Sequence, residues 1–271
     1  MKIDGIEISH YDKLIFPKAK ITKLDMARYY EKMAGRMLPF LKDRPLTLQR
    51  FPDGIDKNGF YQKHAQDYYP DFVKRITVKT EDGEAEEIMC NNKESLIYLA
   101  NQGVVTYHIW SSRKDKPDFP DKMVFDLDPS DQDFEKVKQS AKIVKDYLRS
   151  KDREAKVMTT GKSGLHVFYS MRRTKPFDQV RKEARKMAEE MVDRHSDLLT
   201  IETRKNKRED KVYVDYLRNS YGQTSVCPYS LRANPSAGVA TPLEWKELDN
   251  IDAGDTYGYK NIFRRLGAQS G

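Results

Sequence analysis

Between positions 123 and 217, two amphipathic helical stripes alternate with four short runs of strand character. The expected elements are a strand at 123–128, a helix at 132–150, strands at 155–160 and 165–170, a helix at 177–195 and a strand at 211–217. Their order, β-α-β-β-α-β, is that of the split βαβ unit in ferredoxin-like and RNA-recognition-motif folds. The sequence therefore predicts an α+β protein in which two helices cover one face of a sheet and leave the other face free for a site.

The first third of the chain predicts a second, mixed α/β module. Thr22 is placed to cap a helix that continues to about Leu41, and Pro39 is expected to end that helix. The segment 43–64 is predicted to be loop-rich, with turn signals at Asp53-Gly54 and Asn58-Gly59. Three further elements are expected: a hairpin of 73–79 and 86–90 around Asp82-Gly83, a helix at 93–102 and a strand at 104–110.

The strand at 123–128 carries two carboxylates on one face. Residues i and i+2 of a strand point the same way, so Asp126 and Asp128 share a face while Phe125 and Leu127 pack toward the helices. Adjacent carboxylates repel each other unless a cation or a shared proton offsets the repulsion. Hard divalent cations prefer oxygen ligands, which makes Mg²⁺ or Mn²⁺ the natural occupant. The alternative is a solvated Asp pair at a strand end, or one that caps the next helix.

Two further polar residues fall on strands of the same predicted sheet. Asp215 lies in the apolar strand 211–217, where an unpartnered carboxylate is costly. If the first and fourth strands of the split βαβ are neighbours, Asp215 joins Asp126 and Asp128 in one three-carboxylate metal site. His166 also alternates with apolar neighbours, and it belongs either to this site or to the core as a hydrogen-bonded histidine.

The turn at 159–164, with the sequence TTGKSG, only superficially resembles a P-loop. The Walker pattern requires glycine where this chain has Lys156, and the turn leads into a strand instead of a helix. A P-loop NTPase is therefore excluded. The glycines, hydroxyls and Lys162 remain suited to a triphosphate, with an ordinary hairpin turn as the alternative.

Basic residues gather in three segments, two of which include aromatic side chains. The segments are Arg204, Lys205, Lys207 and Arg208; Lys13, Lys18, Lys20 and Lys23 around Phe16 and Pro17; and Phe60, Tyr61 and Lys63. Such combinations suit stacking on bases and contact with phosphates, although each is also compatible with ordinary solvated surface. The formal net charge of +7, from 49 Lys+Arg against 42 Asp+Glu, is consistent with a polyanionic partner.

Composition excludes several other classes of protein. Cys90 and Cys227 are the only cysteines, which excludes a disulfide scaffold and a cysteine-rich zinc site. No apolar run approaches the roughly 18 residues that span a bilayer, and the first ten residues lack the apolar segment of a signal peptide. We therefore expect a soluble intracellular protein.

Several motifs occur in order along nearly the whole chain. They are HYDKLIFPKAKITKLDMARYY, LTLQRFPDGIDKNGFYQKH, VVTYHIWSSR, MVFDLDPS, TTGKSGLHVFYS, VYVDYLRNSYGQTSVCPYSLRA and VATPLEW. With these motifs the chain resembles the polymerase domain of bacterial ligase D and its stand-alone archaeal relatives, within the archaeo-eukaryotic primase superfamily. The resemblance implies template-directed nucleotidyl transfer in the non-homologous end joining of DNA double-strand breaks.

The resemblance also implies roles for individual residues. Asp126, Asp128 and Asp215 match the catalytic, metal-binding carboxylates; His108, Thr160, Lys162, Ser163, His166 and Arg232 match nucleotide-binding positions; Lys13 and Lys23 match lysines for a downstream 5′-phosphate; and Phe60, Tyr61, Lys63 and Arg208 fall at DNA and template contacts. Relatives commonly have lysine directly before Gly-Leu-His, where this chain has Ser163 and carries Lys162 one place earlier.

We therefore expect a primase-type polymerase with an N-terminal α/β module, 1–110, that contacts DNA and its 5′-phosphate, and a catalytic module, 111–271, the two packed as one unit. The resemblance implies two-metal catalysis with Mn²⁺ or Mg²⁺, NTP or dNTP substrates and a preference for ribonucleotides. It further implies gapped or broken DNA, a Ku-like protein and a separate DNA ligase as partners, and a cytoplasmic, nucleoid-associated location in a prokaryote. The alternatives are a de novo primase, a non-catalytic DNA-end-binding protein and a metal-dependent nuclease.

Overall fold

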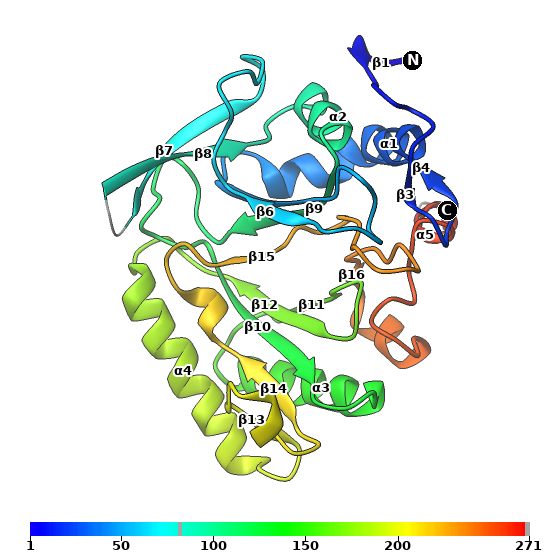
Figure 1. Ribbon diagram of the computed structural model, residues 1–271. Coiled ribbons are helices and arrows are strands. Elements are labelled where there is room, and N and C mark those ends of the chain that lie inside the picture. Colours follow the sequence, from blue (N-terminus) through cyan, green and yellow to red (C-terminus); the bar gives the residue numbers. More distant parts are fainter. Residues whose placement is uncertain (81–82, 269–271) are drawn as a thin grey trace.

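The computed structural model describes residues 1–80 and 83–268, and the two largest sheets that these residues form face each other. Figure 1 shows four layers: helices α1 and α2, a four-stranded sheet, a six-stranded sheet, and helices α3 and α4. In the described part of the chain, no helix combines the length and apolar character needed to cross a membrane.

The six-stranded sheet contains the predicted split βαβ unit. Its strand order is β13-β14-β10-β12-β11-β16. The bounds are β10 (Lys122–Pro129), β11 (Lys156–Thr159), β12 (Leu165–Ser170), β13 (Leu199–Thr200), β14 (Val212–Asp215) and β16 (Pro242–Leu243). The fourth strand of the unit, β14, lies beside the first, β10, as the split βαβ requires.

Helices α3 (Phe134–Ser150) and α4 (Phe177–Arg194) cover one face of this sheet. The apolar stripe of α3, with Val137, Ala141 and Val144, packs in one core with Phe125 and Leu127 of β10. The Asp133 side chain caps α3 by accepting the backbone N–H groups of the first turn. The predicted division of β10 into an apolar and a carboxylate face is therefore confirmed.

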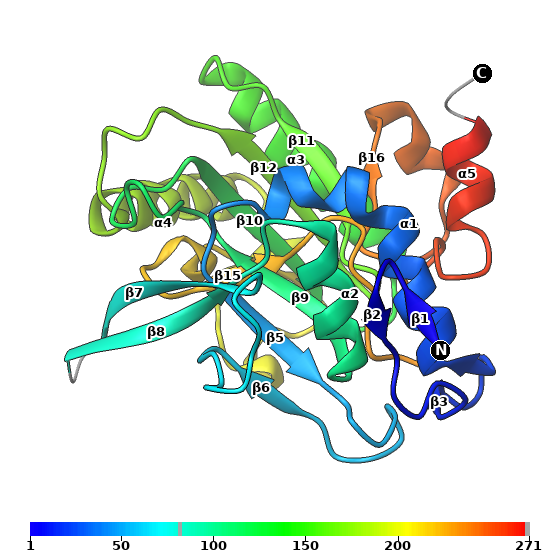
Figure 2. The ribbon, with the colours of Figure 1, turned by 90° about the horizontal axis from the view of Figure 1, so that it is seen from above.

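The four-stranded sheet has the order β15-β9-β5-β6. Its strands are β5 (Leu46–Arg50), β6 (Phe60–Gln62), β9 (Val104–Trp110) and β15 (Thr224–Val226). Helices α1 (Lys23–Leu41) and α2 (Lys93–Asn101) cover its outer face, as seen from above in Figure 2. The second half of the chain thus supplies a strand, β15, to a sheet built mainly by the first half; the division of the chain at residue 110 stays a prediction.

Shorter elements complete the fold. They are β1 (Lys2–Ile3) with β2 (Ile6–Glu7), β3 (Leu14–Phe16) with β4 (Ile21–Thr22), β7 (Lys74–Thr80) with β8 (Gly83–Met89), the 3₁₀ turns η1 (Lys205–Lys207), η2 (Leu217–Asn219) and η3 (Trp245–Asn250), and α5 (Ile262–Ala268). The hairpin of β7 and β8 is confirmed, but Asp82 in its predicted turn lies outside the described residues.

One local prediction is incomplete and one is wrong. The loop-rich segment 43–64 also contains two strands that were not foreseen, because β5 and β6 pair within it and join β9 in the four-stranded sheet. Pro39 does not end α1, which continues to Leu41 with proline inside it. At its start, α1 has the predicted Thr22 cap, completed by Asp25 as a capping box.

Candidate active site

Asp126 lies at the centre of the six-stranded sheet, on the face that the helices leave uncovered. It stands directly opposite His166 of β12 on one side and Asp215 of β14 on the other. All three side chains are buried, and Asp126 Oδ1 lies 3.3 Å from His166 Nε2. The prediction that Asp215 lies beside the Asp126-x-Asp128 pair is confirmed, and His166 belongs to the same cluster.

The electrostatics of this cluster disfavour further negative charge. Burial raises the pKa of Asp128, and the neighbouring Asp126 raises it further. Burial also raises the pKa of Asp215. Burial opposes the ionisation of Asp126 as well, but His166 and Arg218 together hold the pKa of that carboxyl below its usual range. An added cation at these carboxylates would therefore be stabilised.

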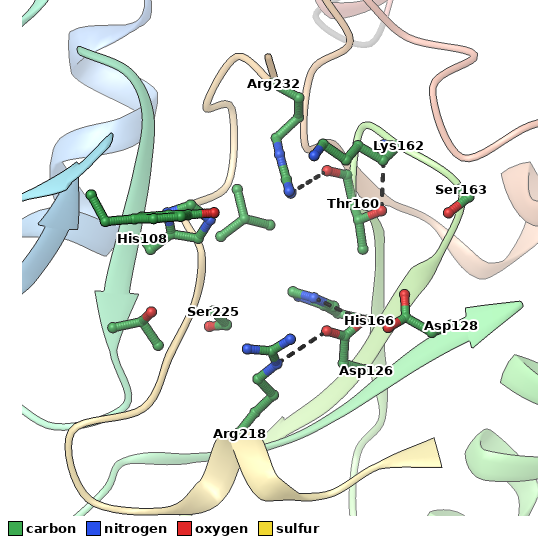
Figure 3. A pocket seen from close by; sticks show the side chains of 13 residues that line it. His108, Asp126, Asp128, Thr160, Lys162, Ser163, His166, Arg218, Ser225 and Arg232 are labelled. Atoms are coloured by element: carbon green, nitrogen blue, oxygen red, sulfur yellow. Dashed lines mark hydrogen bonds and ion pairs between the residues drawn. The ribbon is translucent and has the colours of Figure 1, made fainter. Parts of the chain in front are cut away.

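Arg218, which the sequence reasoning missed, bridges Asp126 and Asp215, and Figure 3 shows its contact with Asp126. Its Nε lies 3.3 Å from Asp126 Oδ2 and 3.1 Å from Asp215 Oδ2. The strand β14 ends at Asp215 because Asp215 Oδ1 accepts the backbone N–H of Leu217 at 2.8 Å, which starts the turn η2. This turn brings Arg218 back toward the carboxylates, and the spacing Asp-x-x-Arg is the only sequence signal for it.

Within residues 1–80 and 83–268, no three His, Cys, Asp or Glu side chains converge as a ready-made cation cage. The donors nevertheless fit a divalent cation at Asp126 and Asp128. Asp126 Oδ1 is buried and accepts no hydrogen bond from the described residues, and Asp128 lines the open cavity beside it. Carboxylate oxygens are the ligands that Mg²⁺ and Mn²⁺ take. The metal site stays a prediction.

A cavity of about 290 Å³ lies above the carboxylates, between the two sheets (Figure 3). It brings together many of the predicted residues with several that were not foreseen: Tyr61, His108, Asp126, Asp128, Thr160, Lys162, Ser163, His166, Arg218, Thr224, Ser225, Val226 and Arg232. Lys162 and Arg232 lie on one side of the cavity, and Asp126, Asp128 and Arg218 lie on the other (Figure 3). The cavity thus has a cationic wall opposite a carboxylate floor.

The cationic wall is built by the loop between β11 and β12. Gly161 has φ +70°, and a Cβ at this position would lie 2.8 Å from the backbone N of Ala240, so only glycine fits. The Thr160 hydroxyl bonds Gly164 and Lys162 within the loop, and the predicted phosphate contacts of Thr160, Lys162 and Ser163 stay predictions.

Arg232 holds this loop from the other side. One of its terminal nitrogens donates to the Thr160 carbonyl at 2.7 Å, while its Nε is buried without a hydrogen-bond partner among the described residues. Burial and the neighbouring Arg232 both lower the pKa of Lys162. An anion in the cavity would relieve the repulsion between these two cations and give the Arg232 Nε a partner.

His108 and Tyr61 close the cavity from the four-stranded sheet. Their ring centroids lie 6.0 Å apart. Burial and the Arg232 charge lower the pKa of His108 to about 3, so its imidazole is neutral at pH 7. Its Nδ1 is buried and makes no hydrogen bond in the described structure. Tyr61 is exposed and free to stack on a flat ligand.

A second cluster, the N-terminal cationic cluster, consists of Lys13, Lys23 and Arg50. The β3–β4 hairpin brings the backbones of the two lysines together, since the Lys23 N–H donates to the Lys13 carbonyl at 2.8 Å. The Lys13 ammonium pairs with Asp53 at 2.9 Å, and the Lys23 ammonium donates to Ser9, so a shared anion stays a prediction. Burial lowers the pKa of Lys23 to about 8, and the charges of Lys13 and Arg50 lower it further. Arg50, which the sequence reasoning missed, also lies over the exposed ring of Phe60.

Two predicted contact residues lie away from the cavity. Arg208 is buried, donates to the carbonyls of Glu202 and Thr203, and lies 4.0 Å from the ring centroid of Tyr213. It therefore braces its own loop in this structure. Lys63 follows the edge strand β6 with an exposed side chain, and its carbonyl accepts the backbone N–H of Ile88 from β8. Their roles toward template and DNA stay predictions.

Comparison with known proteins identifies the family. The sequence profile of the LigD primase-polymerase domain matches residues 22–271. The bifunctional non-homologous end joining protein LigD of Bacillus subtilis is 33% identical over 247 residues, which cover 90% of this chain and 40% of that protein. The multifunctional LigD of Pseudomonas aeruginosa is 27% identical over 98% of this chain and 32% of its own length. This chain thus spans less than half the length of these relatives.

A solved structure agrees with the sequence comparisons. The polymerase domain of Mycobacterium tuberculosis ligase D, in complex with DNA, superimposes with a TM-score of 0.90 at 27% identity and covers 97% of this chain and 94% of its own. The predicted primase-type fold and the resemblance drawn from the motifs are therefore both confirmed. The chain belongs to the LigD primase-polymerase domain family.

Proposed function

We propose that this chain is a template-directed nucleotidyltransferase that fills gaps and extends ends during non-homologous end joining, with a preference for ribonucleotides. The observation that carries the proposal is the cavity itself, in which Asp126, Asp128 and His166 face Lys162 and Arg232. The two walls suit the two reacting groups of nucleotidyl transfer. The carboxylate side suits a hydroxyl that must lose its proton, and the cationic side suits an anionic leaving group. The family and the DNA complex of the M. tuberculosis relative support a DNA substrate.

In the proposed reaction, the primer 3′-oxygen forms a bond to the α-phosphorus of the incoming nucleotide. The bond between the α-phosphorus and its bridging oxygen breaks, pyrophosphate leaves, and the hydroxyl proton passes to solvent or a carboxylate. Lys162 and Arg232 bind the β- and γ-phosphates and so orient the leaving group. His166, next to Asp126, donates to a phosphate oxygen through its ring nitrogen.

Divalent cations held by Asp126, Asp128 and Asp215 would supply neutralisation of the triphosphate and a lower pKa for the 3′-hydroxyl. The neutral His108 and the exposed Tyr61 contact the sugar and base of the nucleotide from the opposite sheet. The preference for ribonucleotides and for Mn²⁺ rests on the family resemblance. Both preferences are tested by direct comparison of NTP with dNTP and of Mn²⁺ with Mg²⁺.

The N-terminal cationic cluster binds a downstream 5′-phosphate in this proposal. Lys13, Lys23 and Arg50 concentrate positive charge, and Arg50 lies over the exposed ring of Phe60, which is suited to stack on the terminal base. A Ku-like end-binding protein and a DNA ligase are the partners that the family resemblance implies, and the relatives from Bacillus subtilis and Pseudomonas aeruginosa are named for non-homologous end joining.

The test is primer extension on a gapped duplex, comparing NTP with dNTP and Mn²⁺ with Mg²⁺. The proposal expects templated incorporation, faster with NTP. Synthesis on bare single-stranded template without a primer would favour the de novo primase. Binding of DNA ends without incorporation would favour the end-binding protein. Shortening of the strand without added nucleotide would favour the nuclease.

A further inference from the structure

Arg218 occupies the position between two carboxylates to which the proposed function assigns a divalent cation. Its Nε lies 3.3 Å from Asp126 Oδ2 and 3.1 Å from Asp215 Oδ2. Because Asp126 and Asp215 are direct partners on adjacent strands, these two oxygens come from opposite sides of one narrow site. A guanidinium and a divalent cation neutralise facing carboxylates in the same way, so they compete for the same oxygens.

The backbone that carries Arg218 is anchored on both sides. The Leu217 N–H donates to Asp215 Oδ1 at 2.8 Å. The Asn219 side chain bonds both backbone groups of Val124, accepting at 2.8 Å and donating at 2.7 Å. The guanidinium can therefore change position only by rotation of the Arg218 side chain, while the backbone stays in place.

The Arg218 side chain itself is held by carboxylates and opens toward solvent. It is 36% exposed and opens onto the cavity. In the part of the chain that the structure describes, its ion pairs and hydrogen bond go to Asp126 and Asp215 and to no backbone carbonyl. Once the carboxylates take another cation, nothing described here holds the guanidinium in place.

Two other arginines show what a structural arginine looks like in this fold. Arg44 is 5% exposed and donates to the carbonyls of Phe40, Trp110 and Ser112 as well as to Asp121. Arg208 is 9% exposed and is likewise held by backbone carbonyls. Arg218 differs from both, since it is more exposed and rests on carboxylate pairs, which weaken when a competing cation is present.

We propose that Arg218 is a displaceable counter-ion of the metal site: it neutralises Asp126 and Asp215 in the metal-free protein and must leave them before both can hold a divalent cation. This inference rests on the proposed function, because that function supplies the need for the cation. It has two consequences. Arg218 lowers the affinity of the protein for the cation, and it stabilises the metal-free fold against carboxylate repulsion.

The test measures the binding of Mn²⁺ alone, without nucleotide or DNA, from the electron paramagnetic resonance signal of free Mn²⁺. Arg218→Gln removes the competing charge and is expected to bind Mn²⁺ about tenfold more tightly than the wild type. Arg218→Lys keeps the charge and should lie closer to the wild type. Arg185→Gln removes the same charge from a surface ion pair with Glu189 on α4, and should match the wild type.

Thermal unfolding gives an independent readout. Without metal, Arg218→Gln should melt below the wild type, and Mn²⁺ should raise its Tm by more than it raises the wild-type Tm. If the glutamine variant does not fold, Arg218→Met, which keeps the aliphatic stem, takes its place in both measurements. Equal or weaker Mn²⁺ binding in the charge-removing variant would overturn the proposal, and so would a lack of Mn²⁺ binding in every protein.

Primer extension separates this inference from the proposed function. If the wild type binds Mn²⁺ more weakly than Arg218→Gln but adds no nucleotide to a primer, the counter-ion role of Arg218 is supported and the polymerase function is contradicted. If the wild type extends primers but Arg218→Gln has the wild-type affinity for Mn²⁺, the polymerase function is supported and the counter-ion role is contradicted.

Discussion

Asp126 and Asp215 stand opposite each other on two neighbouring antiparallel strands, and the Nε of Arg218 lies within 3.3 Å of both. The pairing joins residues that are far apart in the chain, and it occurs on the sheet face that the helices leave open. Facing carboxylates of this kind are costly without a cation.

The first prediction concerns the carboxylates. Asp126→Asn and Asp215→Asn keep the side-chain shape but remove the charge that would hold a cation. Each should lower the rate of primer extension by at least about a hundredfold, or about 2.7 kcal/mol of transition-state stabilisation. DNA binding should persist, because the N-terminal cationic cluster lies elsewhere. A variant that kept a tenth of the wild-type rate would remove its residue from the catalytic set.

The second prediction concerns Arg232, which donates to the Thr160 carbonyl and leaves a buried Nε without a partner. Arg232→Ala loosens the phosphate loop and removes a cation from the cavity. The KM for the nucleotide should rise about tenfold or more. Arg264→Ala, an equal loss of charge at an exposed position of α5, should leave the KM unchanged. An unchanged KM in Arg232→Ala would give this arginine a purely structural role.

The third prediction concerns the N-terminal cationic cluster. A 5′-phosphate on the downstream strand should improve binding to gapped DNA about tenfold over a 5′-hydroxyl. The double variant Lys13→Ala Lys23→Ala should lose this difference. The matched double variant Lys18→Ala Lys20→Ala changes exposed lysines of the same hairpin and should retain it. Titrations at one fixed salt concentration measure the difference. Equal wild-type affinity for the two ends would contradict the break-recognition role.

The same cluster predicts a pH dependence. Burial lowers the pKa of Lys23 to about 8, whereas a bound phosphate favours its protonated form. Binding of the 5′-phosphate therefore takes up a proton. The advantage of the phosphorylated end should be largest below pH about 8 and should shrink as the pH rises above that value. An advantage that stays constant between pH about 7 and about 9.5 would exclude Lys23 as the titrating group.

The fourth prediction concerns Glu87 on β8, whose Oε2 is buried without a hydrogen-bond partner among the described residues. Burial raises its pKa from 4.5 to about 7. The folded protein holds this proton more tightly than the unfolded chain does. The resulting stability is therefore complete below pH about 4.5 and is lost as the pH rises through about 7.

Glu87→Gln cannot ionise and therefore should not lose stability as the pH rises. At pH about 8 it should increase the free energy of unfolding by about 1–3 kcal/mol, and it should flatten the pH dependence between pH about 5 and about 7.5. Glu84→Gln, at an exposed position of the same strand, should change neither quantity. Urea unfolding across this pH range provides the measurement. A less stable Glu87→Gln protein at pH about 8 would show that the charged carboxylate is compensated.

Much of the catalytic sheet could be predicted because local pattern and tertiary packing agree there. The apolar stripe of α3, the alternation around Asp126 and the apolar strand around Asp215 each predict their own element and its buried face. The order of the elements then leaves one well-known sheet topology, which places Asp215 beside Asp126.

The features that the sequence did not predict, such as strand β5 and the role of Arg218, depend on residues far away in the chain. Leu46 and Leu48 of β5 lie among turn-forming residues, and their strand exists because β9 pairs with it. Arg218 lies in a short 3₁₀ turn without periodicity, and its role depends on where Asp126 lies. Pro39 is tolerated in the last turn of α1, where only a few residues follow it.

The most direct test of the central claim is single-nucleotide incorporation opposite each of the four template bases in a gapped duplex with a 5′-phosphate. The account predicts that wild-type protein with Mn²⁺ adds the complementary ribonucleotide in each case, and that Asp126→Asn adds none. Incorporation that ignores the template base, or equal incorporation by Asp126→Asn, would contradict it.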